Sequence, residues 1–437
     1  MSILLINPWI YDFAAYDLWA KPLGLLYIAS ILRKYSYEVN FIDCLDRHHP
    51  NLPKPCKIKE YGQGKYYSLE IEKPSLYKDI PKRYKRYGIP LDVFEAELKA
   101  IDKPAVILVT SMMTYWYPGV FDAIKILRNY FNDIPIILGG IYATLCYEHA
   151  VKYSGADYII KGKNILPVLK LVDNLTKNTH NYSNFPAELD KYPYPAYDLI
   201  RKLDYVCILT SIGCPYRCSY CATHLLSPEF IQRNPLNVVD KIGYYYRKFN
   251  LKNFAFYDDA LLINAENHIC IILEEIAKRG VKCNFHTPNA MHINSLNKSL
   301  AHLLFKSNFK TIRLGFETSS PSLQKRTGGK VTNQEFKSAV KNLISAGYQS
   351  KDIEVYVMTG LPGQSEKEVI DSINFVASTG AKIKLVEFSP IPGTKEWCRT
   401  GLDSDADPLL HNNSLLLFQG HESYQRLKEL MNKHNHH

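Results

Sequence analysis

Short, almost wholly apolar segments alternate with amphipathic segments along residues 1–175 of the chain. Apolar runs of this kind predict buried strands, and apolar positions at helical spacing predict helices between them. We expect strands at residues 3–6, 39–42, 105–110, 134–138 and 157–160, and helices at residues 25–35, 117–130 and 148–154. Continuous apolar strands that alternate with helices are typical of an α/β fold with a doubly wound parallel sheet, Rossmann-like or flavodoxin-like.

A second series of the same kind follows a polar, proline-rich stretch at residues 176–204, which we interpret as a linker. We expect strands at residues 205–209, 253–257, 281–286, 311–316, 353–358 and 383–388, with helices between them, for example at 265–279 and 333–346. Repeats of this kind predict a partial (β/α)6 barrel, like part of a TIM barrel, over residues 205–394. Residues 395–437 are a C-terminal extension in which we expect a helix at 422–432.

The stretch 47–104 interrupts the first series and differs from it in composition. It is rich in Lys, Arg, Tyr and Pro, and it carries much of the excess behind the net charge of +10. A loop of this length is uncommon in a compact domain and is often functional. We interpret it as an insertion that contacts an anionic substrate or a partner, or as a lid or a solvated basic surface. The sequence does not indicate a nucleic acid as this partner.

The remaining composition argues against membrane and secreted classes. The 437 residues, of which 46% are hydrophobic, contain no apolar run of about 18 residues. The N-terminus lacks the charged region and the cleavage site of a signal peptide, so we expect a cytoplasmic protein with no membrane contact. The ten cysteines are mostly scattered, which does not indicate a disulfide framework.

Three of these cysteines, Cys214, Cys218 and Cys221, stand directly after the first strand of the second series. Thiolates this close can point at one metal centre, and sulfur ligands select iron–sulfur clusters, zinc or copper. Zinc usually takes four protein ligands, and the tight loop leaves His224 little room to complete such a site. A [4Fe–4S] cluster held by three cysteines leaves one iron open. Three buried thiols are the remaining interpretation, but they give no reason for the spacing.

This loop resembles the signature of the radical S-adenosylmethionine (SAM) enzymes, CxxxCxΦC, in which Φ is aromatic and is here Tyr220. The resemblance implies that Cys214, Cys218 and Cys221 hold a [4Fe–4S] cluster whose open iron chelates SAM. It implies also that an external one-electron donor, a flavodoxin or ferredoxin, reduces the cluster. SAM is then split into methionine and a 5′-deoxyadenosyl radical.

Polar or irregular residues at the ends of the later strands match further landmarks of this family. The resemblance implies that Asp258 and Asp259 contact the amino group of SAM, and that Glu317 bonds its ribose or its amino-acid part. The other residues that it assigns to SAM are Tyr220, Arg313, Met358 and Pro390. Arg313 either binds a carboxylate or forms an ion pair with Glu317.

The first half resembles the cobalamin-binding domain that precedes the radical SAM domain in many enzymes. The residues that carry this resemblance lie at 22–27, 139–144 and 156–158. It implies a cobalamin pocket made of Leu23, Gly24, Ser111, Met113, Gly139, Gly140, Thr144 and Gly162. In such a pocket a hydroxyl bonds the buried base, and glycines let the backbone approach a bulky ligand. The histidine that the family supplies to cobalt has no counterpart after the first strand.

We therefore expect a radical SAM enzyme with cobalamin as a further cofactor. The expected reaction is methyl transfer to an unactivated carbon of an unidentified substrate, and the basic insertion favours an anionic one. Relatives also perform ring closures and rearrangements. One alternative is a radical SAM enzyme without cobalamin that binds its substrate through the N-terminal domain. The other is an iron–sulfur protein that binds or senses without turnover.

Overall fold

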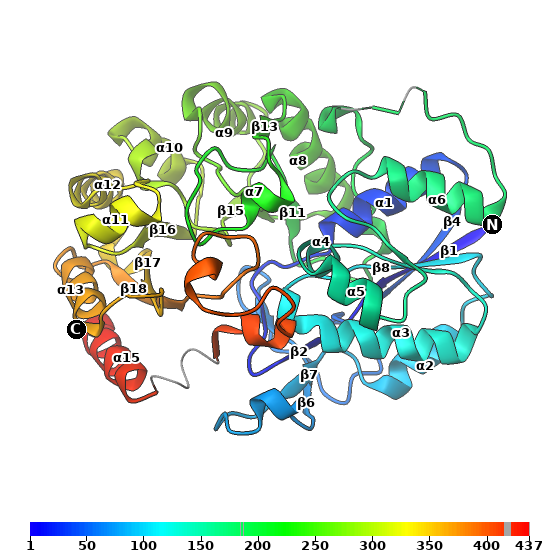
Figure 1. The fold of residues 1–437 in the computed structure, drawn as a ribbon. Coiled ribbons are helices and arrows are strands. Elements are labelled where there is room, and N and C mark those ends of the chain that lie inside the picture. Colours follow the sequence, from blue (N-terminus) through cyan, green and yellow to red (C-terminus); the bar gives the residue numbers. More distant parts are fainter. Residues whose placement is uncertain (184, 187, 415–420, 437) are drawn as a thin grey trace. The chain divides into compact units, whose positions relative to one another are not determined.

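The structure is a computed structural model that describes residues 1–183, 185–186, 188–414 and 421–436. It divides into two compact units (Figure 1). Unit 1 comprises Met1–Asp204 with Ser404–His411, and unit 2 comprises Tyr205–Asp403 with Asn412–His437. Residues 184 and 187 of the expected linker, and 415–420 and 437 of the expected extension, lie outside the described residues.

A five-stranded parallel sheet forms the centre of unit 1, in the order β10-β9-β8-β1-β4. Its strands are β1 (Ser2–Asn7), β4 (Glu38–Asp43), β8 (Val106–Val109), β9 (Ile136–Leu138) and β10 (Tyr158–Ile159). This order is that of flavodoxin-like folds, so the predicted doubly wound sheet is confirmed. Ligands of such sheets bind at the carboxyl edge where the strand order reverses, which here lies between β1 and β8.

Helices cover both faces of this sheet, with α1 and α6 on one face and α2 and α3 on the other (Figure 1). The helices are α1 (Leu23–Lys34), α2 (Leu91–Lys99), α3 (Tyr117–Phe131), α4 (Ile141–Leu145), α5 (Tyr147–Tyr153) and α6 (Leu166–Thr176). Each long helix buries an apolar stripe. In α3 the stripe includes Val120, Ala123, Ile124 and Leu127, at the spacing of one helical face.

The sequence predicts a long loop at 47–104, but part of this stretch is helical. Leu91–Lys99 form α2, the crossover helix between β4 and β8. Its buried residues Val93, Phe94 and Leu98 have helical spacing. The part before α2 folds with the loop after β1 into small antiparallel sheets. Their strands are β2 (Ile10–Asp12), β3 (Tyr16–Asp17), β5 (Gly64–Lys65), β6 (Ser68–Glu70) and β7 (Lys85–Tyr87).

A buried ion pair ties this insertion to the loop after β1. The Arg47 guanidinium lies 2.7 Å from the Asp17 carboxylate and 3.4 Å from that of Asp204, and the side chains of Arg47 and Asp17 are only 2% and 1% exposed. Asp204 also shares a 2.6 Å hydrogen bond with His48, whereas His49 bonds a different carboxylate. Part of the basic character of the insertion is therefore neutralised inside the fold.

The segment Ser404–His411 belongs to unit 1, although the sequence predicted only an irregular extension there. It contains the 3-10 helix η9 (Pro408–His411), which packs on η2 (Thr114–Trp116) just after β8. Its hydrogen bonds join Tyr77 to Leu409 O (2.7 Å), Tyr117 to Asp407 (3.1 Å) and His411 to Thr114 (3.0 Å). A distant part of the chain therefore covers the carboxyl side of β8.

Two three-stranded parallel sheets make the centre of unit 2, β11-β14-β15 and β16-β17-β18. Their strands are β11 (Val206–Ile208), β14 (Asn253–Phe256), β15 (Asn284–His286), β16 (Ile312–Glu317), β17 (Ile353–Thr359) and β18 (Lys382–Glu387). Bridges from Phe285 to Phe309 and from Met291 to Leu314 join the sheets into one arc. No pairing joins β11 to β18 in the described part of the chain, so the arc is open, and the predicted partial barrel is confirmed.

The helices of unit 2 are α7 (Thr223–Leu226), α8 (Pro235–Phe249), α9 (Ile269–Lys278), α10 (Lys298–Lys306), α11 (Pro321–Thr327), α12 (Asn333–Ala346), α13 (Glu366–Ala377) and α15 (His421–Asn435). Of these, α8, α9, α10, α12 and α13 lie on the outer face of the arc (Figure 1). Phe316 of β16 stacks on Phe336 of α12 and on Phe375 of α13. Because side chains alternate along a strand, Arg313 and Gly315 face the inside of the arc.

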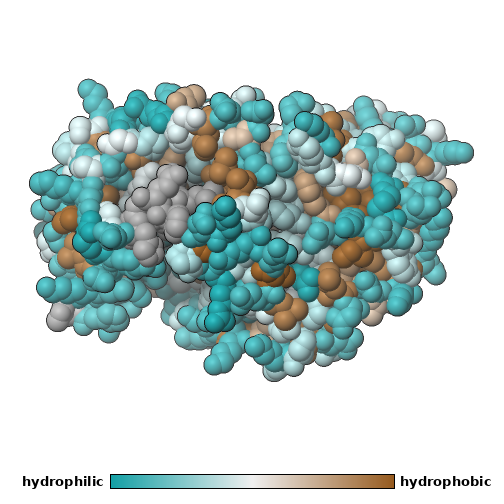
Figure 2. All heavy atoms as spheres, turned by 60° about the horizontal axis from the view of Figure 1, so that its bottom comes forward, coloured by the Kyte–Doolittle hydropathy of each residue, from teal (hydrophilic) through white to brown (hydrophobic). Residues whose placement is uncertain are grey.

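Helix α15 covers the edge strand β18. The Asn435 side chain accepts from Ile383 N–H (2.8 Å) and donates to Ile383 O (2.9 Å), as a neighbouring strand would. No helix in the described ranges is long and apolar enough to cross a membrane. On the face drawn in Figure 2, hydrophilic side chains predominate and apolar ones form small patches.

Candidate active site

A closed loop carries the three cysteines of the predicted cluster site. The short strands β12 (Ser211–Ile212) and β13 (Ile231–Gln232) pair in antiparallel fashion at its base. Gly213 begins the loop with a φ of 79°, and a side chain there would meet Glu229 O at 2.1 Å, so only glycine fits. Across the loop, Arg217 donates hydrogen bonds to Cys214 O (3.0 Å) and to Pro228 O (2.8 Å).

The thiols of Cys214, Cys218 and Cys221 are free and partly exposed. Burial, together with negative charge on the other two thiols, raises the pKa of Cys214 to about 11. Such thiols become thiolates at neutral pH only beside a strong positive centre, such as a metal. No three Cys, His, Asp or Glu side chains among the described residues crowd together as ligands of one ion do. A [4Fe–4S] cluster distributes its thiolates over different irons, so the loop suits a cluster better than zinc.

The segment after α11 lies against the cysteine loop. Ser219 N–H donates to Thr327 O (3.1 Å), and Gly328 has a φ of 125°. A side chain at Gly328 would lie 3.2 Å from the Cα atom of Cys218, so the backbone approaches the loop where glycine leaves room. This contact was not predicted, and its only sequence signal is the pair Gly328-Gly329.

Tyr220, Lys330 and Glu317 form a polar group beside the cysteines. Lys330 Nζ donates to Tyr220 Oη (3.0 Å) and lies 2.8 Å from the Glu317 carboxylate. Burial alone would lower the pKa of Lys330, but the charge of Glu317 raises it well above its usual range, so the ammonium stays charged. Glu317 ends β16 with a φ of 68°, where the register against β17 shifts. Tyr220 and Glu317 were predicted at the site, whereas Lys330 was not.

Asp258, which the resemblance assigns to the amino group of SAM, accepts hydrogen bonds from the base of the cysteine loop. Its carboxylate accepts hydrogen bonds from Thr210 N–H (3.2 Å), Thr210 Oγ1 (2.6 Å) and Ser211 Oγ (2.5 Å). Burial raises the pKa of Asp258 to about 6, although these hydrogen bonds act to lower it. Asp258 therefore braces the end of β14 against the start of the loop. Asp259 is less buried and remains the carboxylate that we propose for SAM.

Arg313 pairs with Glu354 of β17. Its Nε atom lies 3.0 Å from the Glu354 carboxylate, and its NH1 atom donates to Thr287 O (3.2 Å). Arg313 is in register with Glu354, and Lys330 forms the ion pair with Glu317. The alternative of an ion pair between Arg313 and Glu317 is therefore wrong. Register decides such pairs, since directly opposite side chains on neighbouring strands are the closest.

His292 is a further residue that sequence reasoning missed. Its ring stacks on Tyr216 of the cysteine loop, with ring centres 4.6 Å apart, and its Nε2 atom lies 4.0 Å from Cys214 Sγ. Burial lowers the pKa of His292 to about 4, so the ring is neutral. The chain before it runs beside β16, where Met291 N–H donates to Arg313 O (2.7 Å). This irregular segment leaves no periodic signal in the sequence.

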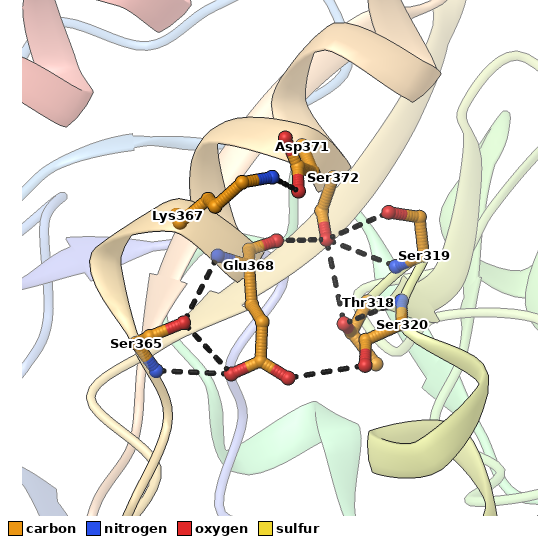
Figure 3. Close-up of polar contacts among 8 residues, drawn as sticks. All are labelled: Thr318, Ser319, Ser320, Ser365, Lys367, Glu368, Asp371 and Ser372. Carbon is orange, nitrogen blue, oxygen red and sulfur yellow. Dashed lines mark hydrogen bonds and ion pairs between the residues drawn. The ribbon is translucent and has the colours of Figure 1, made fainter.

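A polar network holds the end of β16 against α13 (Figure 3). Ser372 Oγ is fully buried, donates to Glu368 O (2.6 Å) and accepts from Ser319 N–H (2.9 Å). The Glu368 carboxylate caps its own helix at Ser365 and accepts a 3.0 Å bond from Ser320 Oγ. The network therefore anchors the residues that directly follow Glu317.

Apolar side chains enclose Tyr220 on another side. Leu323, Met358, Leu361 and Phe388 form a buried cluster, and Tyr220 packs against it. Pro390 follows β18 and is also buried. The structure therefore brings the predicted residues Tyr220, Glu317 and Met358 together.

In unit 1, several residues predicted to bind cobalamin gather at the carboxyl edge of the sheet. Gly140 has a φ of 101°, and a side chain there would meet Ser111 O at 2.2 Å. Thr144 Oγ1 donates to Gly140 O (2.7 Å) and accepts from Gly162 N–H (3.0 Å). Ser111 Oγ donates to Gly139 O (2.7 Å), and Ser111 is only 2% exposed. The hydroxyl predicted to bond the base is therefore engaged within the protein.

Part of this edge of the sheet is lined by glycines, which present backbone without side chains. A side chain at Gly24 or Gly162 would meet no atom within 4 Å, and one at Gly139 would meet only Ile160 O, at 3.9 Å. Leu23 is buried at the start of α1, and Met113 is 37% exposed. Backbone without side chains lets a bulky ligand approach closely. These residues fit a large ligand such as cobalamin.

Residues 208–376 match the family model of the radical SAM superfamily. This part of the chain is a radical SAM domain. The match contains the cysteine loop and the ends of β14, β16 and β17, which is the site assembled above. The predicted enzyme class, its [4Fe–4S] cluster and its SAM are thereby confirmed.

Two relatives of this chain are named methyltransferases. It is 22% identical over 406 residues to an uncharacterized methyltransferase of Pyrococcus horikoshii, with 86% of this chain and 77% of the relative covered. It is 21% identical over 460 residues to the cytidylyl-2-hydroxyethylphosphonate methyltransferase of Streptomyces wedmorensis, with 90% and 80% covered.

Solved radical SAM structures share the fold of both units. TsrM, a methyltransferase of Kitasatospora setae determined with tryptophan and a SAM analogue, matches at 16% identity with a TM-score of 0.70, covering 98% of this chain and 88% of its own. OxsB, determined with aqua-cobalamin and SAM, matches at 15% identity with a TM-score of 0.60, covering 96% of this chain and 56% of its own. At these identities the likeness concerns the fold alone.

Proposed function

We propose that this protein is a cobalamin-dependent radical SAM methyltransferase that methylates an unactivated carbon. The observation that carries the proposal is the carboxyl edge of unit 1, which presents bare backbone at Gly24, Gly139 and Gly162. The names of the relatives support methyl transfer, and the similar structures TsrM and OxsB contain cobalamin.

The residues of unit 2 have complementary roles in this proposal. Cys214, Cys218 and Cys221 would hold the cluster, which, once reduced by a flavodoxin or ferredoxin, would supply one electron for the cleavage of SAM. Lys330 holds the hydroxyl of Tyr220 beside the cysteines, and the apolar cluster around Met358 keeps water away. The protein thus contributes orientation and a dry site, and the cofactors contribute the reactivity.

The test is anaerobic cobalamin binding by the cluster-reconstituted protein, measured as the absorption spectrum after gel filtration. We expect one cobalamin per chain. In the variant Gly24→Phe the new ring enters open space at the edge of the sheet and should block the ligand. The matched control is Lys34→Phe, at the other end of α1, which should leave binding unchanged. Equal binding by both variants would remove this edge from the site.

A second candidate is a radical SAM enzyme that works without cobalamin. The observation in its favour is the hydroxyl of Ser111, which is bonded to Gly139 O rather than presented to a ligand. If this candidate is right, the protein retains no cobalamin after gel filtration but still forms 5′-deoxyadenosine from SAM under reducing conditions.

A further inference from the structure

The inner face of the sheet β16-β17-β18 carries an excess of positive charge. The opposite face packs on α12 and α13, so alternate side chains point inward. The charged residues on or over this inner face are Arg313, Glu317, Lys330, Glu354, Lys382 and Lys384. Lys330 and Glu317 neutralise each other at 2.8 Å. The other four comprise three cations and one carboxylate, which leaves an excess of two positive charges.

The strands arrange these side chains in rows. Arg313, Glu354 and Lys382 are in register across the sheet, and the next row is Gly315, Tyr356 and Lys384. A side chain added at Gly315 would meet Glu317 Oε1 and Lys330 Nζ, each at 3.2 Å. The pair of Lys330 and Glu317 therefore lies over the second row.

This geometry brings the second row close to the cysteine loop. Lys330 touches the Tyr220 hydroxyl at 3.0 Å, and Tyr220 lies between two of the cysteines in the sequence. A ligand on Tyr356 would therefore lie beside the residues that contact the loop, and Lys384 stands one strand further along the same row.

The lysine ammonium groups of the two rows are not saturated. Glu354 receives its shortest contact from Arg313, at 3.0 Å, whereas Lys384 and Lys382 lie 3.3 Å and 3.8 Å from it. Both lysine side chains are 43% exposed. The Tyr356 hydroxyl makes no hydrogen bond to another described residue, although Tyr356 is partly buried. Two ammonium groups and a phenol thus remain available to a ligand.

We propose that this inner face binds an anionic group of the substrate, a carboxylate or a phosphate, through Lys384 and Tyr356, with Lys382 beside them. Ammonium groups and a hydroxyl donor suit such an anion, and a concave, partly desolvated face strengthens the attraction. The inference rests on the proposed function and names its substrate class. The anion anchors one end of the substrate, so that a carbon at the other end faces the cysteine loop.

The test uses inorganic pyrophosphate as the probe. Its affinity for the full-length, cluster-reconstituted protein is measured by anaerobic calorimetry, with and without saturating SAM. We expect Lys384→Gln to weaken pyrophosphate binding about tenfold, since it removes one charge-assisted contact. Tyr356→Phe should weaken it less, and Lys341→Gln, on the exposed side of α12, should leave it unchanged. The iron content of each variant confirms that the fold is intact.

The outcomes separate the possible sources of the anion. Pyrophosphate that binds together with SAM and depends on Lys384 supports a substrate anion. Pyrophosphate that competes with SAM, with SAM weakened equally in Lys384→Gln, assigns the face to the carboxylate of SAM and overturns the proposal. Absence of binding to the unaltered protein, or equal binding by the Lys384 and Lys341 variants, also overturns it. The assay contains no cobalamin, so its result stands whether or not the protein retains that cofactor.

Discussion

Replacing Asp258 by alanine is expected to cost the protein its cluster rather than its affinity for SAM. The Asp258 carboxylate binds Thr210 and Ser211, which directly precede the turn at Gly213 and the first cysteine. Without this brace the base of the loop is free to move, and the thiolates lose the geometry that a cluster requires.

The magnitude follows from the donors that remain. Thr210 and Ser211 are 0% and 1% exposed, and Thr210 Oγ1 keeps a 3.0 Å partner in His268. The Thr210 N–H and the Ser211 hydroxyl lose their acceptor, at about 1–3 kcal/mol each, or about 2–6 kcal/mol together. Burial raises the pKa of Asp258 from 3.8 to about 6. At pH 8 the folded protein keeps this carboxyl ionised at a cost of about 3 kcal/mol, and the alanine variant is free of that cost. The net loss of global stability is then at most about 3 kcal/mol, and the damage is local to the loop.

The assay compares iron content, absorption near ~400 nm from the thiolate-bound cluster and SAM affinity per cluster. We expect Asp258→Ala to retain less than about half of its iron, and Asp258→Asn, which keeps one acceptor oxygen, to retain more. The control Asp259→Asn should keep its iron and bind SAM more weakly. Full iron content in Asp258→Ala, combined with weakened SAM binding, would show that Asp258 contacts SAM and would refute the brace.

Three other predictions concern the loop, the insertion and the docked segment. Gly213→Ala should prevent cluster assembly, because its Cβ atom would lie 2.1 Å from a carbonyl oxygen. The control Gly329→Ala shares the backbone strain of a positive φ (64°), but its Cβ atom meets no atom within 4 Å, so it should assemble more cluster than Gly213→Ala, as measured by iron content. Asp17→Asn removes the carboxylate closest to Arg47 and should lower the unfolding free energy of unit 1 by about 3 kcal/mol in urea titrations; an unchanged midpoint would contradict this. Burial lowers the pKa of His411 from 6.5 to about 4. The contribution of neutral His411 to the unfolding free energy is therefore fully present above pH 6.5. As the pH falls toward 4, the unfolded state gains a proton that the folded state does not, and about 3 kcal/mol of unfolding free energy is lost. His411→Gln should flatten this part of the pH profile of thermal unfolding.

The strands of both units were predictable because buried parallel strands are continuous apolar runs. Helix α2 was missed, although Val93, Phe94 and Leu98 have helical spacing, because it follows a long stretch rich in Lys, Tyr and Pro. The docking of Ser404–His411 on unit 1 had no local signal either. It depends on contacts with residues about 300 positions away, such as Tyr117 and Thr114.

The candidate site was predictable only in part. The spacing of Cys214, Cys218 and Cys221 is local, so the sequence alone indicates a cluster. The direction of a side chain at a strand end is not local. Asp258 could be placed at the end of β14 from the sequence, but only the structure shows that its carboxylate faces Thr210. Lys330 joins the site because α11 turns its following residues back onto the loop, and no periodicity predicts that turn.

The cysteine loop is held by several separate parts of the barrel. Asp258 braces its base, Gly328 lies against its middle, and Glu396, beyond β18, accepts a 2.7 Å hydrogen bond from Ser219 Oγ and donates its own N–H to Ser219 O (3.1 Å). None of these hydrogen bonds involves Tyr356 or Lys384 on the inner face. Support of the cluster and recognition of the ligand are thus carried by different residues. An open barrel permits this division, because its strand ends hold the loop while one face of the sheet is left for the substrate.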